Sequence, residues 1–268
     1  MLEFLEDNGI GYVAIAIGLV VLLVIVGVIG SARQMRRRKG KIREWAFRSG
    51  FEYAEGPMPA RDLAPIRDFA TDDSNTEATA TNVVRGSRGV RVTLLDLRRT
   101  TKKQSGSHGN RTEYSTSTDT YALFSLASPL PSFYFNPLTI AGLDTVYGKL
   151  LGGIMAFAQA VDAGPAKQRI PIPDRPGFLL ISHDGDRPAP LFAGERARFF
   201  DDKCGWSVET EGSWLLITCN PAIYGHGFKR LSKSVVDATN YDDFVNVATA
   251  IQQHLTKSVS HEFAGDGE

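Results

Sequence analysis

The fold class is decided by Gly205-Trp-Ser-Val-Glu-Thr-Glu-Gly-Ser-Trp-Leu-Leu-Ile-Thr-Cys-Asn220, which carries aromatic and β-branched residues on both sides of a Gly-Ser pair. Glycine suits the first central position of a type II′ turn, the tight turn that joins antiparallel strands. We therefore expect a β-hairpin that pairs Val208 with Ile217 and Trp206 with Cys219. A turn one residue earlier would place Cys204 opposite Cys219, but it suits the Gly-Ser pair less well.

Other strand patterns come before this hairpin. Residues 78–84 and 90–97 predict two strands joined by the glycine-bearing loop 85–89, and residues 120–126 predict a third. The intervening segment 98–119 is polar and rich in Ser, Thr and Gly. We expect it to be a long loop, because it has little apolar surface to offset the entropy of ordering.

Strands are also predicted nearer the C-terminus. Residues 132–135 lie between two prolines and predict a strand at a sheet edge, where a missing N–H is tolerated. Residues 169–172 and 177–182 predict two more strands, and residues 190–202 a helix.

Helical patterns lie near both ends of the soluble part, over residues 41–49, 60–69 and from Asn240 onward. Asn240 is a suitable N-cap for the last helix, whose apolar residues Phe244, Ala248, Ile251 and Leu255 share one face. Strands grouped by hairpins, with helices at the ends, predict an α+β fold of antiparallel sheet with flanking helices.

The N-terminal region contains the apolar run 10–32, which has no charged residue. About 20 apolar residues span the hydrocarbon core of a bilayer as a helix, so we expect one transmembrane helix here. The residues before it are acidic, and arginines stand where a signal peptide would have its cleavage site. These features favour an uncleaved anchor.

A basic segment, residues 33–43, follows the apolar run. Positive charge on one side of a span marks the cytoplasmic side, so we expect a cell-membrane protein with its N-terminus outside and residues 33 onward in the cytoplasm. In that reducing compartment Cys204 and Cys219 are expected to be free thiols. The residues expected to contact lipid headgroups are Arg33, Arg36, Arg37, Arg38, Lys39, Lys41 and Arg43.

The expected organisation is therefore a short outer N-terminus (1–9), the span (10–32), the basic segment (33–43), a cytoplasmic α+β domain (44–257) and a flexible tail (258–268). A subdivision near 138–165 is an alternative, because residues 138–161 are largely apolar with small residues at every fourth position. This small-residue stripe consists of Gly148, Gly152, Ala156 and Ala160. Ordinary core packing, contact with a membrane surface or another copy, and a second span are its three interpretations.

Charge excludes one class of partner. The 268 residues include 30 Lys and Arg and 30 Asp and Glu, so the net charge is zero. Because the basic segment contains part of the positive charge, the rest of the chain is mildly acidic. No nucleic-acid partner is expected.

Motifs for chemistry are scarce. The sequence has no phosphate-binding loop, dinucleotide fingerprint, nucleophile elbow or metalloprotease helix, and no cofactor is expected. His183, Asp184 and Asp186 place three potential metal ligands within one Asp-Gly turn, and His226 stands between two glycines. Adjacent turn residues seldom converge on one ion, so the pattern favours a plain turn over a metal or catalytic site.

The order of parts resembles that of uncharacterised bacterial single-pass membrane proteins with a cytoplasmic α+β domain. The resemblance rests on the span, the basic segment, Glu44-Trp-Ala-Phe-Arg-Ser-Gly-Phe-Glu-Tyr53, Asn82-Val-Val-Arg-Gly-Ser-Arg-Gly-Val-Arg-Val92 and the 205–220 hairpin. It implies no catalytic residue, because the family brings no assigned activity. Residues 138–161 depart from the family's pattern.

Together these features predict a membrane-anchored, non-catalytic binding or scaffold domain, whose partners are the lipid bilayer and a protein or a second copy of the chain. One alternative is a membrane-tethered hydrolase that uses His183, Asp184 or His226. The other is an oligomeric assembly that uses residues 138–161.

Overall fold

The structure is a computed structural model that describes residues 17–22, 25–26, 33, 35–64, 76–105, 111–137, 168–173, 175, 178–182, 185, 187–203, 205–219 and 236–262. The chain divides into two compact units, Met1–Glu44 and Trp45–Glu268. The described residues of the first unit are helical. Within the described part of the chain, no helix is both long and apolar enough to cross a membrane. Most of the predicted span 10–32 lies outside the described residues.

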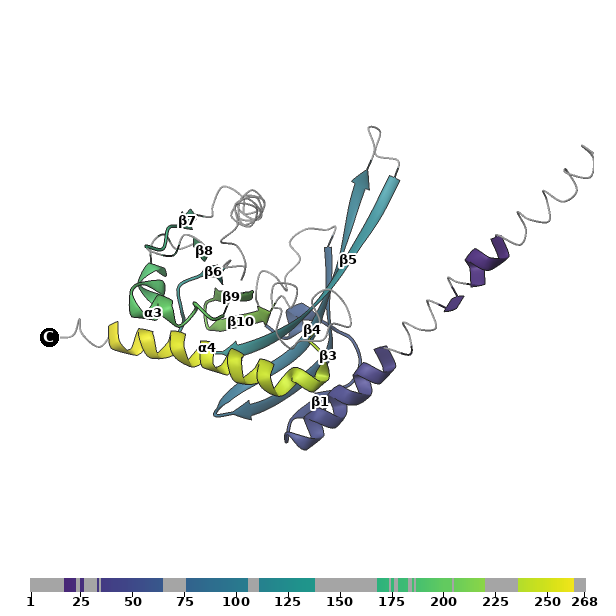
Figure 1. The fold of residues 1–268 in the computed structure, drawn as a ribbon, viewed down its shortest axis with the longest axis horizontal. Coiled ribbons are helices and arrows are strands. Elements are labelled where there is room, and N and C mark those ends of the chain that lie inside the picture. The colour runs from purple at the N-terminus through teal and green to yellow at the C-terminus, as the bar shows by residue number, and fades with distance from the viewer. Residues whose placement is uncertain are drawn as a thin grey trace, which may run out of the picture. The chain divides into compact units, whose positions relative to one another are not determined.

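The second unit is built on one antiparallel sheet with a few helices, so the expected α+β class is correct (Figure 1). The described strands run in the order β1-β3-β4-β5-β10-β9-β6-β8-β7, and β2 pairs with β3. Their bounds are β1 Glu52–Ala54, β2 Met58–Pro59, β3 Thr76–Arg88, β4 Val90–Ser105, β5 Arg111–Ser125, β6 Phe133–Pro137, β7 Gln168–Ile170, β8 Phe178–Ser182, β9 Trp206–Glu211 and β10 Trp214–Cys219.

The β9–β10 hairpin has the predicted register. Trp206 lies opposite Cys219 and Val208 opposite Ile217. Gly212 has a φ of 58°, which a residue with a side chain rarely adopts. Cys219 is free and buried, as the preferred register requires, while Cys204 lies outside the described residues.

The predicted loop over 98–119 is wrong. Strand β4 continues to Ser105 and β5 begins at Arg111, and their pairing is continuous from Thr93 opposite Leu123 to Ser105 opposite Arg111. Threonine has a high β-propensity, and Thr100 pairs directly with Thr116. Backbone pairing thus extends the two strands beyond the region that a hydrophobic core covers.

Three smaller expectations also differ from the structure. Strand β6 lies between β8 and β9 and is not at an edge, because Pro131 precedes the strand and Pro137 ends it. The helix predicted over 190–202 is broken into η2 (Ala189–Phe192) and α3 (Glu195–Arg198) at Gly194, whose φ is 55°. Helix α4 (Tyr241–Glu262) continues into the predicted tail.

The start of α4 also differs in detail. A short 3-10 turn, η3 (Ala238–Asn240), leads directly into the helix, so Asn240 belongs to that turn. The capping side chain is that of Asp237, whose carboxylate accepts a 2.9 Å hydrogen bond from the Thr239 N–H. Remaining short elements are helical residues 35–48 and η1 (Ala60–Asp62).

An aromatic core fills one face of the sheet, where α4 lies across the strands (Figure 1). Trp206 of β9 stacks on Phe244 of α4 with ring centroids 5.3 Å apart, and Phe135 of β6 stacks on Phe192 at 4.0 Å. At the N-terminal side Trp45 meets Tyr241 edge-on at 5.2 Å. The face therefore joins β6, β9, η2 and α4 into one packed layer.

The opposite face carries a smaller core. Here the apolar residues of β4, β5 and β10 pack beneath the segment around η1. Its buried members are Ala60, Ala64, Ala78, Ala80, Val83, Leu95, Leu97, Tyr121, Leu123 and Leu216. Both faces of β4 and β5 are thus covered by a core. This cover ends at Leu97 in β4 and at Tyr121 in β5.

Gly86 of β3 permits a close approach to this sheet. A Cβ placed there would lie 2.2 Å from Cδ1 of the Phe51 ring, and the Phe51 ring in turn lies 5.1 Å from that of Trp45. Only a residue without a side chain leaves room for the Phe51 ring.

Candidate functional site

The outer half of the β4–β5 pair, which we call the ribbon (residues 98–105 and 111–119), carries a run of exposed side chains from Tyr114 to Ser117. Pairing between β3 and β4 ends at Thr76 opposite Thr101, so the ribbon extends beyond β3. Pairing between β5 and β10 involves residues Tyr121 to Ser125 of β5. No described strand pairs with the outer edge of β5 from Arg111 to Asp119. Figure 1 shows the ribbon projecting from the sheet.

Side-chain and loop contacts show which backbone groups point to that open edge. The Thr120 carbonyl accepts a 2.8 Å hydrogen bond from the Thr218 hydroxyl on the β10 side, and the Leu126 N–H donates to the Ser213 carbonyl at 2.8 Å. Backbone groups of alternate residues in a strand point to the same side. Tyr114, Thr116 and Thr118 therefore direct their N–H and C=O groups outward, and the odd-numbered residues direct theirs to β4.

The side chains along the edge are exposed and polar. Tyr114 is 68% exposed, an unusual value for an aromatic residue, and Ser115, Thr116 and Ser117 are also exposed. The Thr100 and Thr116 hydroxyls lie 3.4 Å apart across the ribbon. Such a strand edge has the chemistry to take up another extended segment through backbone hydrogen bonds.

A buried polar network fixes the base of the ribbon. The Asp96 carboxylate accepts a 2.7 Å hydrogen bond from the Thr120 hydroxyl and a 2.8 Å bond from the Asn82 side-chain amide. Asp96 is 2% exposed. The Tyr53 hydroxyl donates to the Asn82 side-chain oxygen at 3.1 Å, and the Val236 N–H donates to the Thr120 hydroxyl at 3.0 Å. The network connects β1, β3, β4, β5 and the segment before η3.

Asn82 occupies a strained position in this network. Its φ of 51° makes it the one described non-glycine residue with positive φ, at a point where the β3–β4 register shifts between Thr81 and Val84. Asparagine tolerates this conformation better than most residues. The shift turns the Asn82 amide toward Asp96, so the strain is offset by the charge-assisted hydrogen bond.

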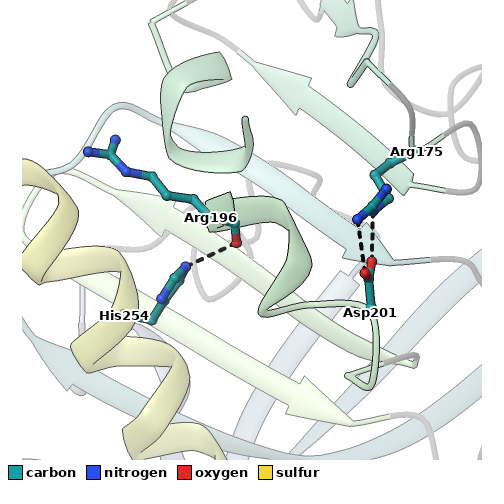
Figure 2. Close-up of polar contacts among 4 residues, drawn as sticks. All are labelled: Arg175, Arg196, Asp201 and His254. Atoms are coloured by element: carbon teal, nitrogen blue, oxygen red, sulfur yellow. Dashed lines mark hydrogen bonds and ion pairs between the residues drawn. The ribbon is translucent and has the colours of Figure 1, made fainter. Parts of the chain in front are cut away.

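A second polar group lies where α4 meets α3. Figure 2 shows His254 beside the carbonyl of Arg196, 3.1 Å from His254 Nε2, and the Arg175 guanidinium facing the Asp201 carboxylate. Arg175 donates from Nε at 2.7 Å and from Nη2 at 2.9 Å, a bidentate pair. The first contact joins α4 to α3, and the second joins the segment before β8 to the segment after α3. Both have a structural role.

The environment of His254 favours its neutral form. Its ring stacks on Phe199 with centroids 4.1 Å apart and an interplanar angle of 9°. Burial lowers the pKa of His254 below its ordinary value of 6.5, and the positive charge of Arg196 acts in the same direction. The hydrogen bond with the Arg196 carbonyl opposes this shift. Neutral His254 donates its Nε2 proton to that carbonyl.

Cys219 is a core residue. Burial raises the pKa of its thiol to about 12, so the thiol stays protonated at neutral pH. A protonated, buried thiol is a poor nucleophile, and Cys219 packs as a small apolar residue.

The predicted headgroup contacts divide into exposed and buried side chains. Arg33, Arg36, Arg37, Lys41 and Arg43 are exposed and Lys39 is partly buried. Arg38 differs, because it is only 3% exposed. Ile42, four residues later, is also buried. Residues four apart lie on the same face of a helix, so Arg38 belongs to the buried face and the neighbouring arginines to the exposed face.

The other predicted site residues lie outside the described part of the chain. These are the metal or catalytic candidates His183, Asp184, Asp186 and His226 and the small-residue stripe Gly148, Gly152, Ala156 and Ala160. Among the described residues, no group of three or more His, Cys, Asp or Glu side chains is placed to hold a metal ion.

Sequence reasoning missed both the open edge and Asp96. The loop prediction for residues 98–119 concealed the edge. Asp96 had a recognisable signal, because an acidic residue within the apolar run Leu94-Leu95-Asp96-Leu97 requires buried partners.

Comparison with known proteins gives no family. No protein-family model matches the chain, and no curated protein does. Among solved structures, the chain is similar to the crystal structure of the mycobacterial trehalose monomycolate transport factor A, TtfA, with a TM-score of 0.42 and 15% sequence identity. The match covers 69% of this chain and 82% of that one. We assign neither fold nor function from this likeness.

Proposed function

We propose that this protein is a single-pass membrane protein whose cytoplasmic α+β domain binds a protein partner at the inner membrane surface and acts without catalysis. The observation that carries the proposal is the open outer edge of β5. No described strand pairs with the outward backbone groups of Tyr114, Thr116 and Thr118, and a partner strand would gain regular N–H···O bonds there.

The contacts of two titratable side chains, Asp96 and His254, favour a binding function over a catalytic one. Asp96 is held by Thr120 and Asn82, and the His254 ring is held by Phe199 and the Arg196 carbonyl. Each contact stabilises the fold and orients the group inward. The reactive side chains in these two places therefore serve as supports for the sheet that carries the ribbon.

The membrane part of the proposal rests on charge and hydropathy. The apolar run 10–32 has the length of a span, and the exposed basic side chains of the following segment suit anionic headgroups. Each such charge near the surface contributes about 1 kcal/mol. An anchor also raises the effective concentration of the domain for any partner in the same membrane.

Site-specific photocrosslinking tests the binding surface. A benzoylphenylalanine replaces Tyr114 in the full chain, in its own membrane, and the matched control carries the same group at Gln253, which is exposed on α4. We expect a discrete crosslinked species from position 114 alone. Equal crosslinking from both positions, or none from position 114, would overturn the binding surface.

Protease accessibility tests the membrane part. In inside-out vesicles the domain after Arg43 should be digested, and in right-side-out vesicles it should be protected. Recovery of the chain in the soluble fraction, or protection with the opposite sidedness, would contradict the proposed anchoring. This result is independent of the crosslinking result.

A further inference from the structure

The middle of the outer edge of β5, residues 114–118, lacks the features that usually protect a strand edge. Edge strands normally carry charged residues, proline or a bulge, since an open row of backbone groups pairs with other chains. Tyr114-Ser-Thr-Ser-Thr118 has no charge and no proline. Its pairing with β4 has no register shift, whereas the β3–β4 pairing does. Among the strands that the structure describes, none covers this edge, and its register is regular.

The two ends of the open edge are defined by the structure. Strand β5 begins at Arg111. At the other end the Thr120 carbonyl is occupied by the Thr218 hydroxyl, and β10 pairs with β5 from Tyr121 onward. The edge available for pairing is thus 111–119, and Ser115 is its midpoint.

We propose that this edge pairs with the same edge of a second copy of the chain, antiparallel, about a two-fold axis at Ser115. In this register Tyr114 lies opposite Thr116 of the second copy, and Thr112 opposite Thr118 of the second copy. These even-numbered residues direct their backbone groups outward, so they form the hydrogen-bonded pairs of the new ladder. The two sheets become one continuous sheet across the axis.

Self-complementarity favours a second copy as the occupant. A two-fold interface uses the same surface on both chains, and the central segment 114–118 has no charge, so it meets its own copy without like-charge repulsion. Each Tyr114 ring, 68% exposed in one chain, gains a β-branched neighbour in Thr116 of the second copy. The ribbon also extends beyond β3, so its tip is accessible to another ribbon.

The inference names the partner in the proposed function. It rests on that function in one respect: the proposed anchor would keep two copies in one membrane at high effective concentration. The pairing itself depends only on the ribbon. Failure of the anchoring and failure of the pairing are therefore separate results.

Cysteine crosslinking in the full chain tests the register. In a background with Cys204→Ser and with the buried Cys219 retained, Ser115→Cys is compared with Ser117→Cys. Residue 115 meets its own copy in a non-hydrogen-bonded pair, with Cα atoms about 4.5 Å apart, which suits a disulfide. Two copies of residue 117 are offset by about 14 Å along the strands, too far for one.

We expect copper phenanthroline to yield at least about tenfold more disulfide-linked dimer from Ser115→Cys than from Ser117→Cys. Adding Thr116→Pro should abolish the dimer, because it removes an outward N–H that β4 does not use, while Thr116→Ala should retain it. Circular dichroism of all variants verifies that the sheet is intact.

Equal yields from the two cysteine variants, or no dimer from Ser115→Cys, would overturn the pairing. If Ser115→Cys gives no dimer while the photocrosslinker at position 114 captures a different protein, the binding function stands and the second copy is excluded. If the chain is soluble yet Ser115→Cys still gives the dimer, the pairing stands and the anchoring fails.

Discussion

The two halves of the β4–β5 pair share one register but have opposite surroundings. The inner half, with Leu94 to Asp96 opposite Thr120 to Ala122, is buried, and the sheet continues on both sides of it with β3 and β10. The outer half is exposed and leaves one edge of β5 without a described strand partner. The same backbone pattern therefore serves stability at one end and, in our proposal, contact with a partner at the other.

This difference separates two causes of strand formation. In the inner half, burial of residues such as Leu95 and Leu97 stabilises the pair. In the outer half, cross-strand backbone bonds and threonine pairs continue a ladder that the inner half has already begun. Changes in the inner half should affect stability, and changes in the outer half should affect association.

The largest expected effect comes from Asp96→Ala at the base of the pair. It leaves the buried Thr120 hydroxyl and the partly buried Asn82 amide without their acceptor, which costs about 3 kcal/mol of unfolding free energy. Urea unfolding of the full chain in detergent measures the loss. Ser117→Ala in the outer half is the control and should change stability by less than about 0.5 kcal/mol. Equal losses would refute the distinction between the halves.

Gly86→Ala should have the next largest effect. The new Cβ would lie 2.2 Å from the Phe51 ring, and overpacking of this kind costs about 1–3 kcal/mol. In a Phe51→Ala background the same substitution should cost much less, because the two residues share one space. Gly40→Ala is the matched control, since nothing lies within 4 Å of its Cβ position in a helical segment. Additive losses in the double variant would contradict this contact.

His254 should give a smaller, pH-dependent effect. Its pKa is lower in the folded chain than the unfolded value of 6.5, because burial disfavours the charged form. The unfolded state then binds more protons at acidic pH, so stability is full above 6.5 and decreases as pH falls below it. His254→Phe should remove this part of the decrease. Parallel urea titrations of both chains at about pH 7.5 and about pH 5.5 measure the difference. An identical pH response of the two chains would refute it.

The smallest effect is expected from Arg175→Ala. It removes the bidentate pair with Asp201, whose side chain is 48% exposed, and exposed ion pairs contribute about 0–1 kcal/mol. High salt should reduce the difference between wild type and variant further. Thermal unfolding with and without salt measures it. A loss as large as that of Asp96→Ala would contradict this expectation, because the ion pair would then contribute as much stability as the base of the ribbon.

Local patterns predicted much of the fold. The Gly212-Ser213 pair determines the β9–β10 register through the turn, and the spacing of Phe244, Ala248, Ile251 and Leu255 predicts the buried face of α4. Both depend on residues close together in the sequence. The coarse α+β class follows from such local signals.

The ribbon and the Asp96 network could not be predicted in the same way. Residues 98–119 have little apolar content, and their strand structure depends on a ladder that begins at Thr93 and Leu123. The partners of Asp96 lie 14 residues away at Asn82 and 24 residues away at Thr120, at a position that the β3 register shift creates. The local sequence signals that Asp96 needs buried partners, but it does not identify which distant residues they are.

Residue-resolved hydrogen exchange across 111–119 tests the central claim most directly. If β4 and β5 are paired along the ribbon, the amides of Ser115, Ser117 and Asp119 point to β4 and should exchange slowly under all conditions. The amides of Tyr114, Thr116 and Thr118 should exchange fast in a single copy and slow down when copies associate. Exchange of Ser115, Ser117 and Asp119 at the rate of an unfolded chain would contradict the account, because the ribbon would then be the loop that its composition suggests.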